Sequence, residues 1–406
     1  MGSDTSGDTT GDLDWLNPRR PAVGACDRGG QGLARRWRIA WRVAAGVLAA
    51  LVLAALVAAR WVVPYYAITP GTALDVARLI SVPRGASHPH RGSVVLTDVQ
   101  LVHLTALGYL YYRFDENAQI VSTEDLTGGS SSSAYDEDGV IEMATARQAA
   151  AFVALRELGY HPRAAPAGVA VVAIQPGASR ASTLAVGDVI TAVGSTRAVA
   201  LGPLVAAVGA VSPGRSIVLT FHGFGSRRPQ RRSVVVDELR SSGSASSATV
   251  SCVPAGSAHG GRVVRRAERA ASCLPLYPEQ LYDDENEPFR ISINADGIVG
   301  SSAGLSFTLG LIDKLDRADL TGGLRIAATG TMSNDGSVGV IAGVAQKTIA
   351  VRAAGASVFF VPPANAATAR AHAGPDLRVI AVSSIGQAIT ALERLGGRLV
   401  RAPAAR

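Results

Sequence analysis

The chain has 406 residues, of which 48% are hydrophobic and 17% are charged. This composition excludes a fully disordered or collagen-like chain and predicts two or three domains with packed cores. The formal net charge of +7 comes almost entirely from arginine, because only two of the 39 cationic residues are lysines, Lys314 and Lys347. In a sequence that uses arginine so much more often than lysine, each remaining lysine is a candidate for chemistry that arginine cannot perform.

An unbroken apolar run from Val43 to Ala59 is followed by Arg60 and then by interfacial aromatic residues. About 20 apolar residues cross a bilayer, so we predict a transmembrane helix over 43–63. Arginines precede the run, so we predict a single-pass protein of the cell membrane with a cytoplasmic N-terminus and extracytoplasmic domains. The cytoplasmic tail over 1–42 is predicted to be disordered. A cleaved signal peptide would have an unusually long leading segment, and a buried core helix is the other alternative.

The cysteines agree with this topology. Cys26 falls in the predicted tail, whereas Cys252 and Cys273 fall in the exported part, where we predict that they form a disulfide. The sequence has no CxxC pair and no HExxH cluster, so we expect no metal site and no cofactor.

Residues 64–164 carry a predicted turn at 67–71, a strand at 92–99 and, after a Gly/Ser tract, an amphipathic helix from Glu142 to Leu158. We assign residues 64–164 to an extracytoplasmic region that contributes to the C-terminal domain over 286–400.

Residues 165–236 contain short β-branched runs around the string QPGASRASTLAVGDVITAVGS. This string resembles the bacterial PDZ domain, which binds an extended peptide by adding it to a sheet edge. The resemblance places the start of the peptide groove at Gly168, Val169 and Ala170. Without it, the stretch predicts a small β-rich domain.

Residues 237–285 read as a Ser/Arg-rich linker that holds the two exported cysteines. Its arginines, with those near residue 230, supply much of the positive charge. A solvated surface is the ordinary interpretation, and attraction to anionic lipid headgroups is the alternative. No nucleic acid partner is expected outside the cell.

Residues 286–400 alternate between helical and strand patterns, which predicts an α/β or α+β layered domain. Strands are expected at 289–293, 324–329 and 357–361, and helices at 302–315 and around Lys347. Ser302 opens the first helix, where a serine either caps the helix or acts as a nucleophile whose oxyanion the helix N-terminus stabilises.

Lys347 lies in the segment GVAQKTIAV, which has no acid within one turn. An unpaired lysine among apolar residues is desolvated and can lose its proton, which a guanidinium cannot do. The alternative is that Lys347 snorkels to water from a helix edge. Lys314 is flanked by acids, so we expect a charged surface residue.

The segment from GIVGSSAGLSF to GVAQKTIAVRAAG resembles the proteolytic domain of Lon-type serine proteases, in particular the membrane-anchored, PDZ-containing Lon-like proteins of Gram-positive bacteria. The resemblance implies that Ser302 is the nucleophile, that Lys347 is the general base, and that Thr329 hydrogen-bonds the lysine. Two positions depart from the family: Ser301 stands where the family has proline, and Val299 stands where Lon has an acid.

These motifs together predict an α+β, membrane-anchored, ATP-independent serine endopeptidase, since no GxxxxGK[ST] motif occurs. Its expected substrates are extracytoplasmic proteins or peptides that the PDZ domain captures, and the resemblance implies a homo-oligomeric ring, a hexamer. The alternatives are a catalytically silent PDZ scaffold and a membrane-surface adaptor. We also expect the PDZ domain to be an insertion in the Lon-type layer.

Overall fold

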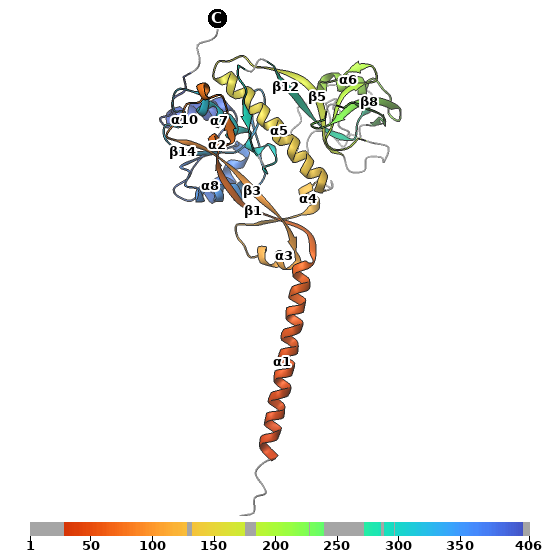
Figure 1. Cartoon of the computed structure of the whole chain (residues 1–406), viewed down its shortest axis with the longest axis vertical. Helices are drawn as coiled ribbons and strands as arrows, with labels where there is room; N and C mark the ends of the chain where they lie inside the picture. The colour runs from red at the N-terminus through yellow and green to blue at the C-terminus, as the bar shows by residue number, and fades with distance from the viewer. Residues whose placement is uncertain are drawn as a thin grey trace, which may run out of the picture. The chain divides into compact units, whose positions relative to one another are not determined.

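The computed structural model describes residues 28–127, 132–174, 184–226, 228–238, 272–285, 288–295 and 297–400. It is a mixed α+β structure (Figure 1). Most of the predicted tail, the Gly/Ser tract, the QPGASRAST part of the PDZ-like string and most of the predicted linker, including Cys252, lie outside the described residues.

The first compact unit of the chain ends at Trp61 and contains helix α1 (Arg28–Arg60). Its segment Ala40–Arg60 has a mean hydropathy of 2.3 and is long and apolar enough to cross a membrane. The helix ends three residues earlier than the predicted span, because Val62 already begins strand β1. Pro64 explains this end: it cannot donate a helical hydrogen bond, and it disfavours helical backbone at the residue before it.

The second unit, Val62–Arg406, contains two large sheets. The larger sheet has the order β18-β17-β14-β3-β1-β4, in which β3, β14, β17 and β18 run parallel and β1 pairs antiparallel with both β3 and β4. Its strands are β1 (Val62–Asp75), β3 (Ser93–Thr105), β4 (Gln119–Ser122), β14 (Arg325–Ala328), β17 (Val358–Val361) and β18 (Arg378–Ala381). Strands from both ends of this unit therefore share one sheet.

The turn predicted at 67–71 is wrong, because Ala67 to Pro70 pair with β3 inside strand β1. The strand bulges between Pro70 and Ala73 instead of reversing. Gly71 permits this path, since a Cβ there would lie 2.1 Å from Asp98 Oδ1.

Helices cover both faces of the larger sheet, because neighbouring strand residues point to opposite sides. Val94, Leu96 and Phe360 pack in one core with α5, α7 and α10, whereas Val95 and Phe359 pack in another with α8 and α9. The helices of this unit outside the smaller sheet are α2 (Val76–Leu79), α3 (Ala106–Tyr112), α4 (Thr123–Thr127), α5 (Ser132–Glu157), α7 (Gly304–Leu315), α8 (Val344–Ala353), α9 (Ala366–Ala373) and α10 (Ile385–Arg394), with 3-10 turns η1 (Arg84–Ala86), η2 (Ser301–Ala303) and η3 (Pro363–Asn365).

Two short strand pairs complete this part: β2 (Ile80–Ser81) with β13 (Ser292–Ile293), and β15 (Thr331–Met332) with β16 (Val338–Gly339). The strand predicted at 289–293 is thus limited to its last two residues. The predicted helix at 302–315 is confirmed, except that its first turn is the tighter η2.

The smaller sheet is inserted between α5 and β13 and has the order β12-β5-β6-β8-β9. Its own core contains the helix α6 (Leu201–Gly209). The strands are β5 (Arg163–Ile174), β6 (Asp188–Val193), β7 (Thr196–Arg197), which pairs with β6, β8 (Ser216–Gly223), β9 (Gln230–Val235) and β12 (Leu276–Glu285), and a separate pair joins β10 (Asp237–Glu238) to β11 (Ser272–Cys273).

The open sheet edge that a peptide would need at Gly168, Val169 and Ala170 does not exist in this structure. Val169 pairs with Gln280 of β12 on one side and with β6 on the other, and its two neighbours are likewise paired with β12. The side chain of Gln280 fixes β12 further, because it donates to the Gly168 carbonyl at 3.0 Å and accepts from the Leu201 N–H at 2.7 Å. The predicted peptide groove is corrected accordingly: the chain's own strand occupies it.

Helix α5 joins the two sheets. It starts ten residues before the predicted Glu142, and Ile141 in its early turns packs against Ala170 and Val189 of the smaller sheet. Its later turns, with Met143 and Val153, belong to the core of the larger sheet. Tertiary packing on both sides stabilises this N-terminal extension, which its local sequence pattern does not predict.

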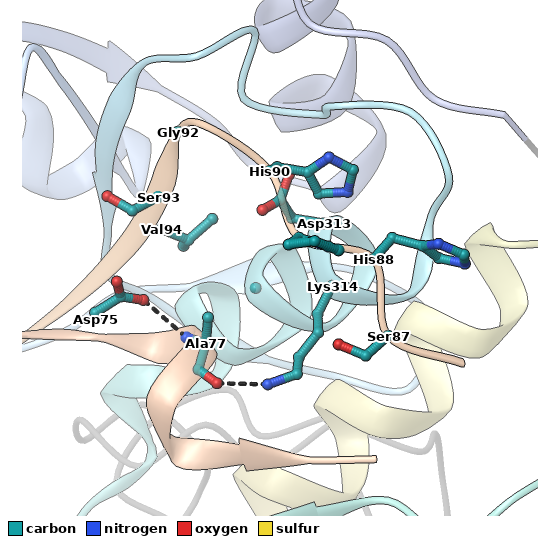
Figure 2. Close-up of a pocket in the computed structure, with 12 residues that line it drawn as sticks. Asp75, Ala77, Ser87, His88, His90, Gly92, Ser93, Val94, Asp313 and Lys314 are labelled. Atoms are coloured by element: carbon teal, nitrogen blue, oxygen red, sulfur yellow. Dashed lines mark hydrogen bonds between the residues drawn. The ribbon is translucent and has the colours of Figure 1, made fainter. Parts of the chain in front are cut away.

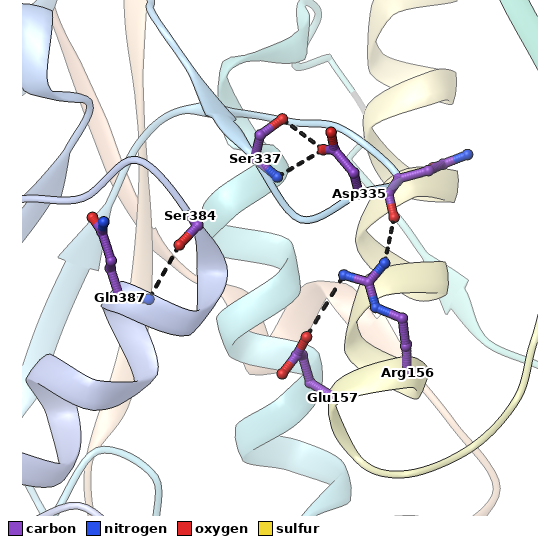
Figure 3. Close-up of polar contacts among 7 residues, drawn as sticks. Arg156, Glu157, Asp335, Ser337, Ser384 and Gln387 are labelled. Carbon is purple, nitrogen blue, oxygen red and sulfur yellow. Dashed lines mark hydrogen bonds and ion pairs between the residues drawn. The ribbon is translucent and has the colours of Figure 1, made fainter.

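The end of α5 also holds the loop that leads toward Lys347 (Figure 3). Arg156 donates to the Asn334 carbonyl at 2.7 Å, and within that loop Asp335 accepts from the Ser337 hydroxyl at 2.6 Å. Ser384 caps α10 nearby by accepting from the Gln387 N–H. These contacts order the chain between β15 and β16.

Candidate active site

Ser302 lies in η2, directly before α7. The preceding Gly300 has a φ of 92°, a left-handed backbone angle that favours glycine, and its N–H donates to the Gly139 carbonyl of α5 at 2.8 Å. This sharp entry places the Ser302 N–H in the first helical turn, where N–H groups have no partner inside the helix. The local sequence thus builds a serine at a helix start with a donor beside it.

Lys347 is in the first turn of α8. Gly343, with a φ of 67°, precedes this helix, and its carbonyl accepts from the Lys347 N–H at 3.0 Å. The lysine side chain is only 3% exposed. The alternative that it snorkels to water is therefore wrong.

The structure brings Ser302, Lys347 and Thr329 together from three separate segments. Lys347 Nζ lies 2.5 Å from Ser302 Oγ and 3.4 Å from Thr329 Oγ1. Thr329, at the end of β14, also donates to the Ser302 carbonyl at 3.1 Å. The Gly330 N–H donates to the same carbonyl at 2.9 Å, so the serine backbone is held from two sides.

Burial lowers the pKa of Lys347 from 10.5 to about 8. The cause is desolvation, which disfavours the cation, and the carboxylate of Asp98 partly opposes it. Asp98 is on β3 and itself accepts from the Thr72 N–H at 2.5 Å. With this pKa the lysine is neutral in about one molecule in ten at pH 7 and in half of them near pH 8, and the neutral form is the one that a general base requires.

Glu142 of α5 is a contributor to this site that sequence reasoning did not identify. Its Oε2 accepts from both the N–H and the hydroxyl of Ser301, at 3.1 and 3.2 Å. Ser301 stands where the resembled family has proline, so a pair of hydrogen bonds to Glu142 takes the place of a rigid ring beside Ser302. The only signal in the sequence was that departure, since its partner lies 159 residues away.

Two further carboxyl groups lie close enough to Glu142 for its charge to affect their pKa values. Burial, helped by the smaller effect of the Glu142 charge, raises the pKa of Asp138 on α5 and of Glu279 on β12 to about 7 in each case. Asp138 Oδ1 is buried and has no hydrogen-bond partner among the described residues. Glu279 of the inserted sheet and Asp138 and Glu142 of α5 thus form a group of interacting carboxyl groups, and Glu142 binds the segment that carries Ser301.

The Ser302 N–H at the helix start remains a predicted oxyanion donor. The Ser302 N–H is placed as expected, but two glycine N–H groups near it are already used, those of Gly300 and Gly330. A second donor is therefore not assigned.

The remaining predicted residues lie elsewhere. Gly168, Val169 and Ala170 are in the paired strand β5, and Cys273 of β11 is buried and disulfide-bonded, while its predicted partner Cys252 is outside the described residues. Within the described ranges, no group of three or more His, Cys, Asp or Glu side chains could hold a metal ion.

Lys314, predicted to be a charged surface residue, is half-buried and its amine is hydrogen-bonded to the backbone. Its Nζ donates to the carbonyls of Ala77 and Ile80, at 2.6 and 2.7 Å, and burial lowers its pKa. It lines a cavity of about 270 Å³ with Asp313, whose pKa burial raises to about 6 (Figure 2). The lysine therefore satisfies backbone oxygens at the end of α2, a structural task.

A scan of the chain against protein-family models found no match, and a search of curated proteins found none either. A functional interpretation therefore rests on the motifs and on the geometry of Ser302, Lys347 and Thr329.

Proposed function

We propose that this protein is a membrane-anchored, ATP-independent serine endopeptidase that uses Ser302 as nucleophile and Lys347 as general base. The observation that carries the proposal is the 2.5 Å separation of Lys347 Nζ and Ser302 Oγ, with the amine almost fully buried. Serine and lysine so placed fit acyl transfer, in which a neutral amine activates a hydroxyl.

In the first half-reaction, neutral Lys347 takes the proton of the Ser302 hydroxyl as Oγ attacks a peptide carbonyl carbon. The new C–O bond gives a tetrahedral oxyanion, which the Ser302 N–H can stabilise. The C–N bond then breaks, and the lysine proton passes to the leaving amine. The products are a free amine and an ester on Ser302.

In the second half-reaction, Lys347 takes a proton from water, whose oxygen attacks the ester carbon. The C–O bond to Ser302 breaks, and the proton returns to Oγ. Thr329 contributes by holding the Ser302 carbonyl and by contacting the lysine amine, which keeps the two reacting groups in register.

The proposed location follows from α1. Its apolar segment Ala40–Arg60 suits a membrane span, and the arginines before it favour a cytoplasmic N-terminus. The catalytic residues would then act on extracytoplasmic proteins or peptides. A PDZ-type identity for the inserted sheet and a hexameric ring remain predictions, and the proposal does not use peptide addition at β5, because β12 would first have to leave.

The test compares Ser302→Ala and Lys347→Arg with Ser301→Ala in the full chain, purified in detergent, on unfolded protein and peptide substrates. We expect the first two variants to lose about 10³-fold or more in kcat/KM, and Ser301→Ala to remain active. Arginine keeps the charge and length of lysine but cannot accept the proton. Persistent cleavage by both variants would refute this pair, and an inactive wild-type chain with intact fold would favour the silent scaffold.

A further inference from the structure

Helix α3 and the turn that follows it present an apolar stripe to solvent. Leu107, Leu110, Tyr111 and Phe114 follow one another at helical spacing and are 43%, 57%, 68% and 80% exposed. No charged residue occurs in Ala106–Tyr112. Single exposed apolar residues are ordinary on a soluble surface, but a continuous stripe of four large ones indicates an interaction site.

The stripe is not the result of a loosely attached helix. Thr105 caps α3 by accepting from the Gly108 N–H at 3.1 Å, and Leu104 just before it is fully buried. On the other side of the helix, the ring of Tyr109 packs against that of Tyr65 on β1, with centroids 5.1 Å apart. The helix is fixed to the sheet, while none of the residues that the structure describes covers its apolar face.

Chain connectivity places α3 beside the end of the predicted span. Thr105 pairs with Val62, which is two residues after Arg60, the last residue of the apolar segment. Two residues reach at most about 7 Å and paired strands lie about 5 Å apart, so the start of α3 is within roughly 12 Å of the span's end. This bound holds for any angle between the span and the sheet.

We propose that this stripe, Leu107, Leu110, Tyr111 and Phe114, inserts into the interfacial region of the same bilayer that α1 crosses. Leucine, phenylalanine and tyrosine are the residues with which interfacial helices enter the boundary between headgroups and acyl chains. Arg113 is exposed next to Phe114 and is placed to meet lipid phosphates. The bilayer is the occupant that the position of the stripe favours over a second protein chain.

The inference requires that α1 crosses the membrane, but it does not depend on peptidase activity. Two attachments, one through the span and one through α3, restrict rotation of the extracytoplasmic part about the span. Substrates would then meet Ser302 at a fixed height above the lipid.

The test uses the full chain with Cys26→Ser, in nanodiscs of phosphatidylcholine and phosphatidylglycerol that hold one copy each. A single cysteine replaces Leu110, or in a second variant Phe114, and carries an environment-sensitive fluorophore. The matched control carries it at Val218, which is exposed on β8 of the inserted sheet. Lipids spin-labelled near their headgroups quench only fluorophores at the interface.

We expect quenching at positions 110 and 114 to be at least about threefold stronger than at 218, with iodide in the buffer giving the opposite order. Quenching equal to that of the control at both positions would overturn the proposal. So would shielding from iodide without lipid quenching that appears only in vesicles holding several copies, because a second copy and not lipid would then cover the stripe. A chain that does not remain with the disc would remove the span and the proposal together, whatever its cleavage activity.

Discussion

In the proposed mechanism the neutral form of Lys347 accepts the proton of Ser302, so the pKa of this one amine would set the pH range of the reaction. With a pKa of about 8, the cation dominates below that pH. We expect kcat/KM to rise about tenfold per pH unit below pH 8 and to level off above it. A rate that does not change between pH 6 and pH 9 would contradict Lys347 as the base.

The Asp98→Asn variant tests the electrostatic part of this reasoning. The carboxylate of Asp98 raises the pKa of Lys347 against the larger effect of burial. Removing its charge should lower the pKa and move the rising limb to lower pH, while the amide oxygen can still accept from Thr72. Asp376→Asn, at an exposed position, should leave the limb in place. A shift to higher pH would contradict the assigned sign.

Glu142 is a positioning residue, because it holds Ser301 and not a reacting atom. Glu142→Ala leaves the Ser301 N–H and hydroxyl without their acceptor, so we expect kcat to fall about tenfold with little change in KM. Glu142→Gln retains a carbonyl acceptor and should recover most of the rate. The pH of the rising limb belongs to Lys347 and should be the same in both variants. Equal losses in both variants would assign Glu142 a role that depends on its charge.

At the scale of elements, α5 and β12 each carry a carboxyl group whose pKa is raised to about 7, Asp138 and Glu279. Glu279 on β12 has a pKa of about 7 in the folded protein, above its ordinary value of 4.5. Between these two values the folded chain binds more protons than the unfolded one, so stability falls as pH rises from about 4.5 to about 7. The inserted sheet is therefore held more firmly at mildly acidic pH.

Glu279→Gln removes that dependence. We expect the free energy of unfolding of the variant to depend less on pH and to exceed that of the wild type by about 3 kcal/mol at pH 8, because no charge has to be buried. The exposed Glu116→Gln should follow the wild type at every pH. A variant that gains stability only below pH 5 would have the wrong sign for this explanation.

The strongly patterned elements were predictable from sequence, and the long-range contacts were not. The helix that follows Ser302, the strand that ends before Thr329 and the helix around Lys347 each show a local period, and a motif joins them. The pairing of β12 with β5 had no such signal, because residues 276–285 read as part of a linker. The hydrogen bonds of Glu142 to Ser301 and those of Lys314 to Ala77 and Ile80 depend on partners far along the chain, which a single sequence does not reveal.

At the scale of the whole molecule, the inserted sheet has its entry and exit side by side. Arg163, its first residue, pairs with Glu285 at the end of β12. An insertion whose ends meet in one ladder can be replaced by a short turn without stretching the host. Its main apolar contact with the rest of this unit runs through Ile141 of α5, which packs on Ala170 and Val189.

We therefore expect a full chain in which a glycine-rich turn of about four residues replaces residues 163–285 to keep the larger sheet and the Ser302–Lys347 pair. Exposing Ile141 should lower the free energy of unfolding by about 2 kcal/mol, and Ile141→Ser in the same background should recover solubility but not create activity. Short unfolded peptides should be cleaved within about threefold of the wild-type rate, because no catalytic group is removed. Protein substrates should be cleaved more slowly if the inserted sheet recruits them. A folded excision variant that no longer cleaves peptides would show that the inserted sheet is required to hold the Ser301 segment, through Glu279 and Glu142, and that the two sheets form one catalytic unit.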